Sequence, residues 1–185
     1  MHTSQLPEIT IRKAAIGDAE LIATVVCMAV GYGREHPIYP VFRELAQREV
    51  AQYSYRNTLV AEVDGVAAGA LVGYDGAQLK ELREPIFGLL ERHLDSPPKI
   101  EDETEAGEFY LDSLGVLPRF RGLGVGRRLL TTMRDKAFAA GHERVGLLVD
   151  FDNPRAEQLY TSLGWRRVGE KRFLGHPMWH LQTTK

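Results

Sequence analysis

The sequence predicts an α+β fold with α/β/α layering, in which a mixed, mostly antiparallel central sheet of about six to seven strands is flanked by helices. Three observations lead to this prediction. Short runs of alternating apolar and polar residues, typical of half-buried strands, recur along the chain. An Asp64-Gly65 pair joins two of these runs as a β-hairpin. A glycine-rich turn at 121–126 separates a strand-like run from a helical one.

The first part of the chain predicts one strand and two helices. Ile9–Lys13 alternates apolar and polar residues, as a short strand does. A helix is expected from Asp18, a suitable N-cap residue, to about Val30. Glycine and prolines make 32–40 a loop, and 41–53 predicts a second helix.

The middle of the chain predicts a hairpin and an inserted helix. Strands are expected at 58–63 and 66–74, on either side of the hairpin turn. The pattern at 85–94 indicates a helix, and the prolines of 95–107 indicate a loop. We interpret the acidic run in this loop as a solvated surface; the alternative is that it attracts a cationic amine. The run consists of Glu101, Asp102, Glu103 and Glu105.

The C-terminal half predicts alternating strands and helices. A strand at 109–116 precedes the glycine-rich turn, and a helix from 125 to about 140 follows it. Pro154 suits the first position of a short helix that Gly164 ends. The remaining strands are expected at 144–150, 165–173 and 178–182.

The turn Arg121-Gly122-Leu123-Gly124-Val125-Gly126 is the most informative motif. Its alternating glycines let the backbone turn tightly and bring N–H groups close to a ligand. At a helix N-terminus, such N–H groups and the helix dipole favour phosphate oxygens. The motif therefore predicts a pyrophosphate site; the alternative is a glycine-rich connection without a ligand. Positive charge is added by Arg119, Arg121, Arg127 and Arg128.

Two common nucleotide-binding motifs with glycine-rich turns do not fit this sequence. A Walker A loop requires Lys-Ser or Lys-Thr after the glycines, and neither is present. A Rossmann fingerprint requires G-x-G-x-x-G near the start of a βαβ unit, whereas this chain has G-x-G-x-G late in the sequence. A different phosphate-bearing cofactor is therefore expected.

A second motif, Asn153 to Tyr160, follows after one further strand. Asn153 is a good N-cap, and seven residues are about two helical turns, so both side chains project from the same side of the helix. Taken alone, Asn153 could be a plain cap and Tyr160 a core aromatic. The pairing with the glycine-rich turn favours a shared role at one site.

With Leu163-Gly164-Trp165 after the second motif, this arrangement resembles the GNAT superfamily of acyl-CoA-dependent N-acyltransferases. The close match covers about residues 108–173, inside a single N-acetyltransferase (GNAT-like) domain expected to span 1–185. The resemblance implies acetyl-CoA as co-substrate, held in a splayed cleft of the sheet. It also implies an amine acceptor that lies between the first two helices and the sheet.

The resemblance also implies roles for single residues. The glycine-rich turn would bind the pyrophosphate of acetyl-CoA, and the strand ending at Val116 would pair with its pantetheine arm. Asn153 would contact the cofactor near its thiol end, and Tyr160 would protonate the departing thiolate. The expected cofactor-binding residues are Leu114, Val116, Arg121, Gly122, Leu123, Gly124, Val125, Gly126, Asn153 and Tyr160.

Acetylation of an amine needs a proton donor and a proton acceptor. A tyrosine with a pKa of about 10 stays protonated at pH 7 and can donate to a thiolate. A primary amine is mostly protonated at that pH, so a base or a water chain helps. Asp112 is the first candidate base, with Glu108 and the Tyr110 hydroxyl, acting through water, as alternatives. Asp112 could instead be a structural carboxylate.

Strand alternation places these candidates on one face. A regular strand directs Glu108, Tyr110, Asp112, Leu114 and Val116 to the same side. A bulge at Gly115 would change that alternation near the end of the strand. The acceptor is expected beside Tyr32, Glu35 and His36, with Arg34 and Tyr39 nearby.

Composition limits the remaining classes. A net charge of −2 gives no reason to expect nucleic acid. Cys27, the one cysteine, excludes an internal disulfide and a cysteine-rich metal site. His176 and His180 share a face but lack a visible third ligand, so no metal is expected. No apolar run reaches the ~18 residues of a membrane helix, and a cytoplasmic protein is expected.

These observations predict an acetyl-CoA-dependent N-acetyltransferase that moves an acetyl group directly to a primary amine of a small molecule or peptide. The alternative is a non-catalytic acyl-CoA-binding sensor or scaffold on the same fold. Transfer to a hydroxyl, or of a longer acyl group, is a weaker interpretation. The expected partners are acetyl-CoA and the amine, with a homodimer left open.

Overall fold

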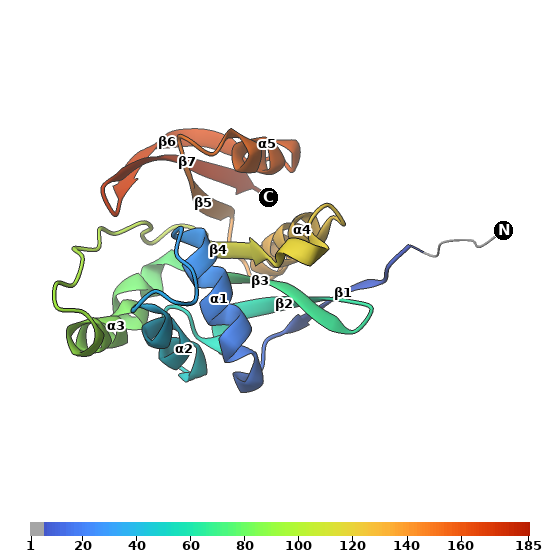
Figure 1. The fold of residues 1–185 in the computed structure, drawn as a ribbon. Helices are drawn as coiled ribbons and strands as arrows, with labels where there is room; N and C mark the ends of the chain where they lie inside the picture. The colour runs from blue at the N-terminus through green and yellow to red at the C-terminus, as the bar shows by residue number, and fades with distance from the viewer. Residues whose placement is uncertain (1–5) are drawn as a thin grey trace.

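The computed structural model describes residues 6–185, which form one mixed sheet with helices on both faces (Figure 1). Its strands follow the order β1-β2-β3-β4-β5-β7-β6, and β4 and β5 are the parallel neighbours in an otherwise antiparallel sheet. The predicted fold class is therefore confirmed. The strands are β1 Ile9–Lys13, β2 Thr58–Val63, β3 Val66–Asp75, β4 Phe109–Val116, β5 Arg144–Asp150, β6 Arg166–Phe173 and β7 His176–Thr184. The α-helices are α1 Ala19–Ala29, α2 Tyr39–Gln47, α3 Leu79–His93, α4 Val125–Ala139 and α5 Pro154–Ser162.

Two apolar cores pack against this sheet. Helices α1, α2 and α3 cover one face, where their side chains meet Val72, Tyr74 and Tyr110 (Figure 1). Helix α4 covers the other face, where Leu129 and Leu130 pack with Leu111 and the buried Trp165. The Trp165 indole donates a hydrogen bond to the Val145 carbonyl at 3.1 Å, so its polar group is satisfied inside that core.

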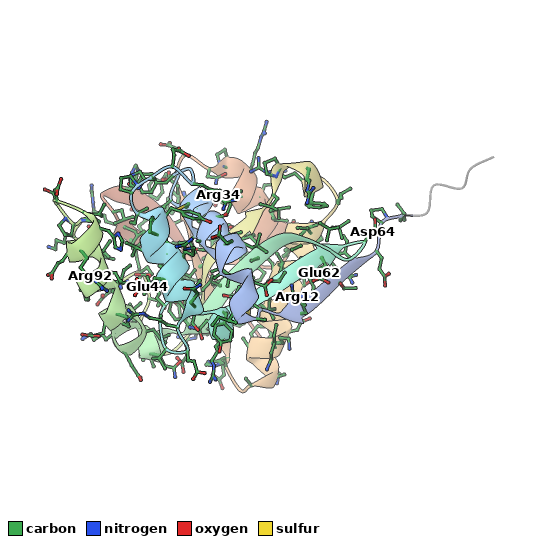
Figure 2. All side chains as sticks on the ribbon, turned by 60° about the horizontal axis from the view of Figure 1, so that its bottom comes forward. Arg12, Arg34, Glu44, Glu62, Asp64 and Arg92 are labelled. Carbon is green, nitrogen blue, oxygen red and sulfur yellow. The ribbon has the colours of Figure 1, made fainter. Side chains whose placement is uncertain are left out.

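Exposed ion pairs connect neighbouring elements on the surface. Arg12 on β1 lies 2.6 Å from Glu62 on β2, and Arg92 on α3 lies 3.8 Å from Glu44 on α2 (Figure 2). At the hairpin tip, the Asp64 carboxylate accepts a hydrogen bond from the Glu8 N–H at 2.9 Å. Exposed pairs of this kind stabilise a fold by at most about 1 kcal/mol each, so the two cores carry the architecture.

Strands β4 and β5 pair over a short stretch and then separate. Phe109, Tyr110 and Leu111 lie opposite Val145–Leu147, and β4 continues to Val116 without a β5 partner. Unpaired strand groups at this point are available to a ligand, because β3 pairs with the other edge of β4. The expected opening in the sheet is therefore confirmed.

Asp112 occupies a bulge in β4. Its neighbours Leu111 and Ser113 pair with Gly73 and Val72 on β3, which leaves Asp112 itself without a partner there. The bulge reverses the alternation, so Leu114 and Val116 pack into the α4 core while Tyr110 packs under α1–α3. The expectation that all of these residues share one face, with any bulge at Gly115, was wrong.

The inserted helix begins earlier than the sequence indicated. The expected helix covered 85–94, but α3 runs from Leu79 to His93 and contains Pro85 in its interior. Asp75 caps the preceding turn by accepting a hydrogen bond from the Ala77 N–H at 3.0 Å. Helix α2 is also shifted, ending at Gln47.

None of the helices within residues 6–185 combines the length and apolar character that crossing a bilayer requires.

Candidate active site

The glycine-rich turn leads directly into α4 with its backbone donors free. Gly122 and Gly124 have φ angles of 81° and 86°, the left-handed region that strains other residues. The first helical bond runs from the Arg128 N–H to the Gly124 carbonyl at 3.1 Å. The N–H groups from Gly122 to Arg127 have no partner within residues 6–185. Since a β-carbon at either glycine would meet no atom within 4 Å, the space above these donors is open to an anion.

The arginines around the turn have different surroundings. Arg121 donates to the Val116 carbonyl at 3.2 Å, and Arg127 donates to the Ser162 hydroxyl at 3.1 Å. The Arg121 side chain therefore lies near the end of β4, and the Arg127 side chain lies near the end of α5. Arg128 instead donates to the Ile9 carbonyl on β1 at 3.0 Å, so its charge is directed toward β1.

The N-terminus of α4 packs between the end of β4 and α5. A β-carbon on Gly126 would lie 3.8 Å from Val116, 3.9 Å from Leu114 and 4.0 Å from Leu159. Tyr160 follows Leu159 and packs against the same core. The structure thus gathers the predicted cofactor residues from β4, the turn and α5 around the opening between β4 and β5.

Asn153 and Tyr160 both lie on α5. The Asn153 side-chain oxygen accepts a hydrogen bond from the Ala156 N–H at 3.2 Å, which is an N-cap interaction. Burial raises the pKa of Tyr160 to about 12, so its hydroxyl remains a proton donor across the neutral range. The Tyr160 carbonyl accepts from the Trp165 N–H at 3.1 Å, which anchors the end of the helix beside the core.

A cavity of about 440 Å³, which we call the carboxylate cavity, lies at the opening on the α1 side of the sheet. Asp112, Glu103 and Asp150 bring three carboxylates to its wall. The rest of the wall comes from the end of α1, from β4 and β5, and from the turn between β6 and β7. A cavity with this charge favours a cationic group. Its other lining residues include Tyr32, Tyr53, Tyr110, Ser113, Leu148, Phe173, Leu174, His176 and Met178.

Asp112 and Glu103 share the same two hydrogen-bond donors. The Tyr74 hydroxyl lies 2.6 Å from Asp112 Oδ2 and 3.3 Å from Glu103 Oε1. The Gln52 amide nitrogen lies 2.9 Å and 2.6 Å from the same two oxygens. The shared donors hold the two carboxylates as a close pair at the cavity wall.

Burial and the neighbouring Asp112 charge raise the pKa of Glu103 to about 7, although Arg83 opposes this rise. Arg83 is buried on α3 and pairs with Glu103 and with Asp102, the latter at 2.8 Å. Its Nε is buried without a hydrogen-bond partner. The carboxylate pair therefore holds a proton that exchanges near neutral pH.

The interpretation of the acidic run as a solvated surface was wrong for Glu103, which is 1% exposed. The sequence does contain a signal for this burial. Arg83 falls on the apolar face of α3 together with Leu79, Leu82 and Ile86. A cation on a buried face requires a counter-charge, and only a carboxylate from another segment could supply it.

Glu108 occupies a different position from Asp112. It is buried and accepts hydrogen bonds from Thr104 at 2.7 Å and Gln182 at 2.7 Å, with His180 Nε2 at 2.9 Å. Burial alone would raise the pKa of Glu108, but hydrogen bonds from His180, Thr104 and Gln182 lower it overall. Glu108 does not line the carboxylate cavity. Tyr110 does line it, and burial raises the pKa of Tyr110 well above its usual value.

The three predicted acceptor residues divide into two groups. The rings of Tyr32 and His36 stack with centroids 3.9 Å apart, and both line a second cavity of about 650 Å³. Tyr32 lines the carboxylate cavity as well. Glu35 is exposed, with its carboxylate folded against Gly33, and lines neither cavity. Tyr39 donates to the Glu20 carboxylate at 2.7 Å instead.

The family model described as "Acetyltransferase (GNAT) family" matches residues 28–165. The chain belongs to the GNAT family of acetyltransferases, and its curated relatives include proteins named N-alpha-acetyltransferase and mycothiol acetyltransferase.

Two curated relatives are similar to the chain. It is 31% identical over 140 residues to the N-alpha-acetyltransferase RimI of Mycobacterium tuberculosis, with 62% of this chain and 87% of that protein covered. It is 33% identical over 123 residues to the mycothiol acetyltransferase of Frankia casuarinae, with 66% of this chain covered. The chain spans only 31% of that second relative's length.

Solved structures share the fold. A crystal structure described as an acetyltransferase is 33% identical, covers 95% of this chain and 98% of its own, and superposes with a TM-score of 0.78. The PaiA N-acetyltransferase of Thermoplasma acidophilum, solved in complex with coenzyme A, is 16% identical with a TM-score of 0.59. It covers 96% of this chain and 99% of its own. At that identity the second likeness is one of fold.

Proposed function

We propose that this protein is an acetyl-CoA-dependent N-acetyltransferase that moves the acetyl group directly to a primary amine of a small molecule or peptide. One observation carries the proposal. The opening between β4 and β5 has a turn with free N–H donors on one side and a cavity lined by carboxylates on the other. An anionic cofactor and a cationic acceptor could therefore reach the same unpaired stretch of β4.

The turn fits the pyrophosphate of acetyl-CoA. The N–H groups from Gly122 to Arg127 would donate to its oxygens, and the α4 dipole would favour its charge. Arg121 and Arg127 would add charge–charge attraction at the same end of the helix. The backbone of Leu114 and Val116, which has no β5 partner, would hold the pantetheine arm. When bound, acetyl-CoA supplies the activated acetyl group and a thiol leaving group.

Asp112 is the group that would take the proton of the acceptor ammonium. It lies at the bulge of β4, lines the carboxylate cavity and belongs to the pair with Glu103. Its neighbour Glu103, whose pKa burial raises to about 7, can hold a proton near neutral pH, so the pair can take up the proton that the ammonium gives to Asp112. Glu108, bound to His180 and Gln182 outside the cavity, is less suited to this role.

The remaining groups would act on the carbonyl and the thiol. The free amine forms a C–N bond at the acetyl carbon while the C–S bond breaks. The nitrogen then loses its excess proton to water, and water returns a proton to Tyr160 after that side chain has protonated the sulfur. Backbone N–H groups at the unpaired end of β4 would stabilise the carbonyl oxygen. Tyr160, kept protonated by its raised pKa, would donate its proton to the sulfur. Asn153, whose amide nitrogen is not used by the cap, would orient the cofactor near the thiol.

A turnover screen tests the proposal. The purified protein is mixed with acetyl-CoA and with polyamines, aminoglycosides, amino acids, simple alkylamines and N-terminal peptides, and free thiol is measured. We expect amine-dependent thiol release with at least one of these classes, and the acetylated amine should be detected by mass spectrometry. Binding of CoA without transfer to any amine would instead support an acyl-CoA sensor.

A further inference from the structure

The second cavity, of about 650 Å³, adjoins the carboxylate cavity. We call it the apolar cavity. Most of its wall is hydrophobic, and α3 and the segment 94–101 that follows it contribute eight of its lining residues. A volume of this size is typical of sites that enclose a small molecule and is far larger than a packing defect. The main apolar side chains are Phe42, Ile86, Leu90, Leu94, Pro98 and Ile100.

The two cavities are adjacent. Gln52 lines the apolar cavity, and its amide nitrogen donates to the Glu103 and Asp112 carboxylates of the other cavity, at 2.6 and 2.9 Å. The walls also have five residues in common, so a ligand that occupied both cavities would lie along these residues. These residues are Val30, Tyr32, Tyr53, Phe173 and Leu174.

The segment 94–101 is fixed over the apolar cavity by a contact across the site. The Glu101 carboxylate accepts a hydrogen bond from the Leu174 N–H at 2.9 Å, which joins the segment to the turn between β6 and β7. The polar groups Lys99 and Glu101 lie on this segment, whereas α3 contributes only hydrophobic side chains to the wall. The α3 side of the cavity therefore has no partner for a second charge.

From this arrangement we propose that the acceptor is an amphipathic amine, whose ammonium group enters the carboxylate cavity and whose aromatic or aliphatic group fills the apolar cavity beneath α3. The inference rests on the proposed N-acetyltransferase activity and names the substrate class of that site. A polyamine fits less well. Glu101, the carboxylate of the apolar cavity, already accepts the Leu174 N–H and lies on the same segment as Lys99, and a second cation on the α3 side would lie against Ile86 and Leu90, which are apolar. Each added methylene of the acceptor should raise kcat/KM by roughly fourfold while the cavity has room.

A series of amines tests the substrate class. We would measure kcat/KM by thiol release for n-alkylamines from ethylamine to hexylamine, for 2-phenylethylamine, and for 1,5-diaminopentane beside pentylamine. We expect a rise along the series and at least a tenfold preference for pentylamine over the diamine. A flat series, or turnover only with polyamines or aminoglycosides, would overturn the inference and leave the proposed activity standing. Absence of thiol release with every amine would overturn the activity itself.

Variants on α3 locate the apolar group. Leu90→Phe should narrow the cavity and lower kcat/KM for hexylamine at least tenfold, with ethylamine within twofold of the wild type. Phe87→Trp is the matched control, because Phe87 lies on the same helix with 49% of its surface exposed. Ile100→Phe repeats the test from the opposite wall, where the half-buried side chain tolerates a larger residue. Equal losses for both amines in Leu90→Phe and Ile100→Phe, with unchanged melting temperature and CoA affinity, would contradict the placement.

Discussion

The two sides of the β4–β5 opening are constructed differently. On the proposed cofactor side, the binding groups are backbone donors of one contiguous turn, Gly122 to Arg127. On the acceptor side, the groups are side chains that arrive from distant segments: Gln52, Tyr74, Glu103 and Asp112. The first kind of site is encoded locally, and the second exists only after the chain has folded. The two sides should therefore respond to mutation in different ways.

The largest expected effect tests the proton donor between the two sides. Tyr160→Phe keeps the ring in the core and removes only the hydroxyl. Turnover should fall by ~10²–10⁴-fold, the usual contribution of a general acid, while CoA affinity changes little. The loss should be smaller with an acetyl thioester whose thiol is more acidic, since that thiolate needs less help. Near-normal turnover of Tyr160→Phe would make this tyrosine a packing residue.

The next prediction concerns the cofactor side alone. Gly124→Asp places an anion beside the donors and a side chain at a φ of 86°. Loss of two hydrogen bonds to a charged group would cost about 3 kcal/mol, or roughly 150-fold in affinity for CoA by calorimetry. Gly141→Asp is a matched control at the other end of α4, with a φ of 98° and equally open space. It should carry similar strain yet bind CoA normally; equal weakening in both variants would remove the turn from the site.

The residues of the proposed cofactor side were predicted from local signals. Glycines at alternate positions, a following helix and the Asn153 cap are readable within 50 residues of sequence. The structure contains that helix and that cap, and it places Gly126 of the turn beside Leu159 of α5. The acceptor side could not be predicted to the same extent. Nothing near Glu103 in the chain distinguishes it from its exposed neighbours Asp102 and Glu105, because its partners lie on α3, on β3 and in the segment between α2 and β2.

The errors in the predicted elements have the same physical reason. The order of strands and helices follows from local periodicity, and it was confirmed. The bulge at Asp112 depends on how β4 pairs with Val72 and Gly73 of β3, which no local pattern in β4 reveals. Pro85 was expected to begin a helix, yet packing of Leu79 and Leu82 against the core extends α3 ahead of it. Tertiary contacts decided both cases.

A third prediction separates the two candidate bases on β4. Asp112→Asn should lower kcat/KM by about 10²-fold, at the low end for a general base because Glu103 remains beside it. Glu108→Gln is the comparison variant, because Glu108 is the other candidate base and lies four residues before Asp112, but its side chain is outside the carboxylate cavity. We expect kcat/KM of Glu108→Gln to fall by less than tenfold, provided that its melting temperature matches that of the wild type. The reverse ranking would move the base to Glu108 and its partner His180.

The smallest expected effect tests the pair itself through pH. In the wild type, the raised pKa of Glu103, about 7, means that the pair takes up a proton as pH falls through 7. The base form is then lost, so kcat/KM should decline below pH 7. Glu103→Gln removes the carboxyl group whose pKa is raised to about 7, so this decline should move to lower pH. At pH 5.5 each protein keeps only a fraction of its plateau kcat/KM. If the decline moves by one pH unit, that fraction should be roughly tenfold larger in the variant than in the wild type.

Controls for this shift come from the same region of the chain. Glu105→Gln removes an exposed carboxylate from the same segment and should leave the pH profile unchanged. Because Glu103→Gln also deprives the buried Arg83 of a partner, the double variant Glu103→Gln with Arg83→Met removes the cation as well. Both Glu103 variants should show the shifted profile. If neither moves the decline, the proton near neutral pH belongs to the substrate amine or to another group, and Asp112 acts without Glu103.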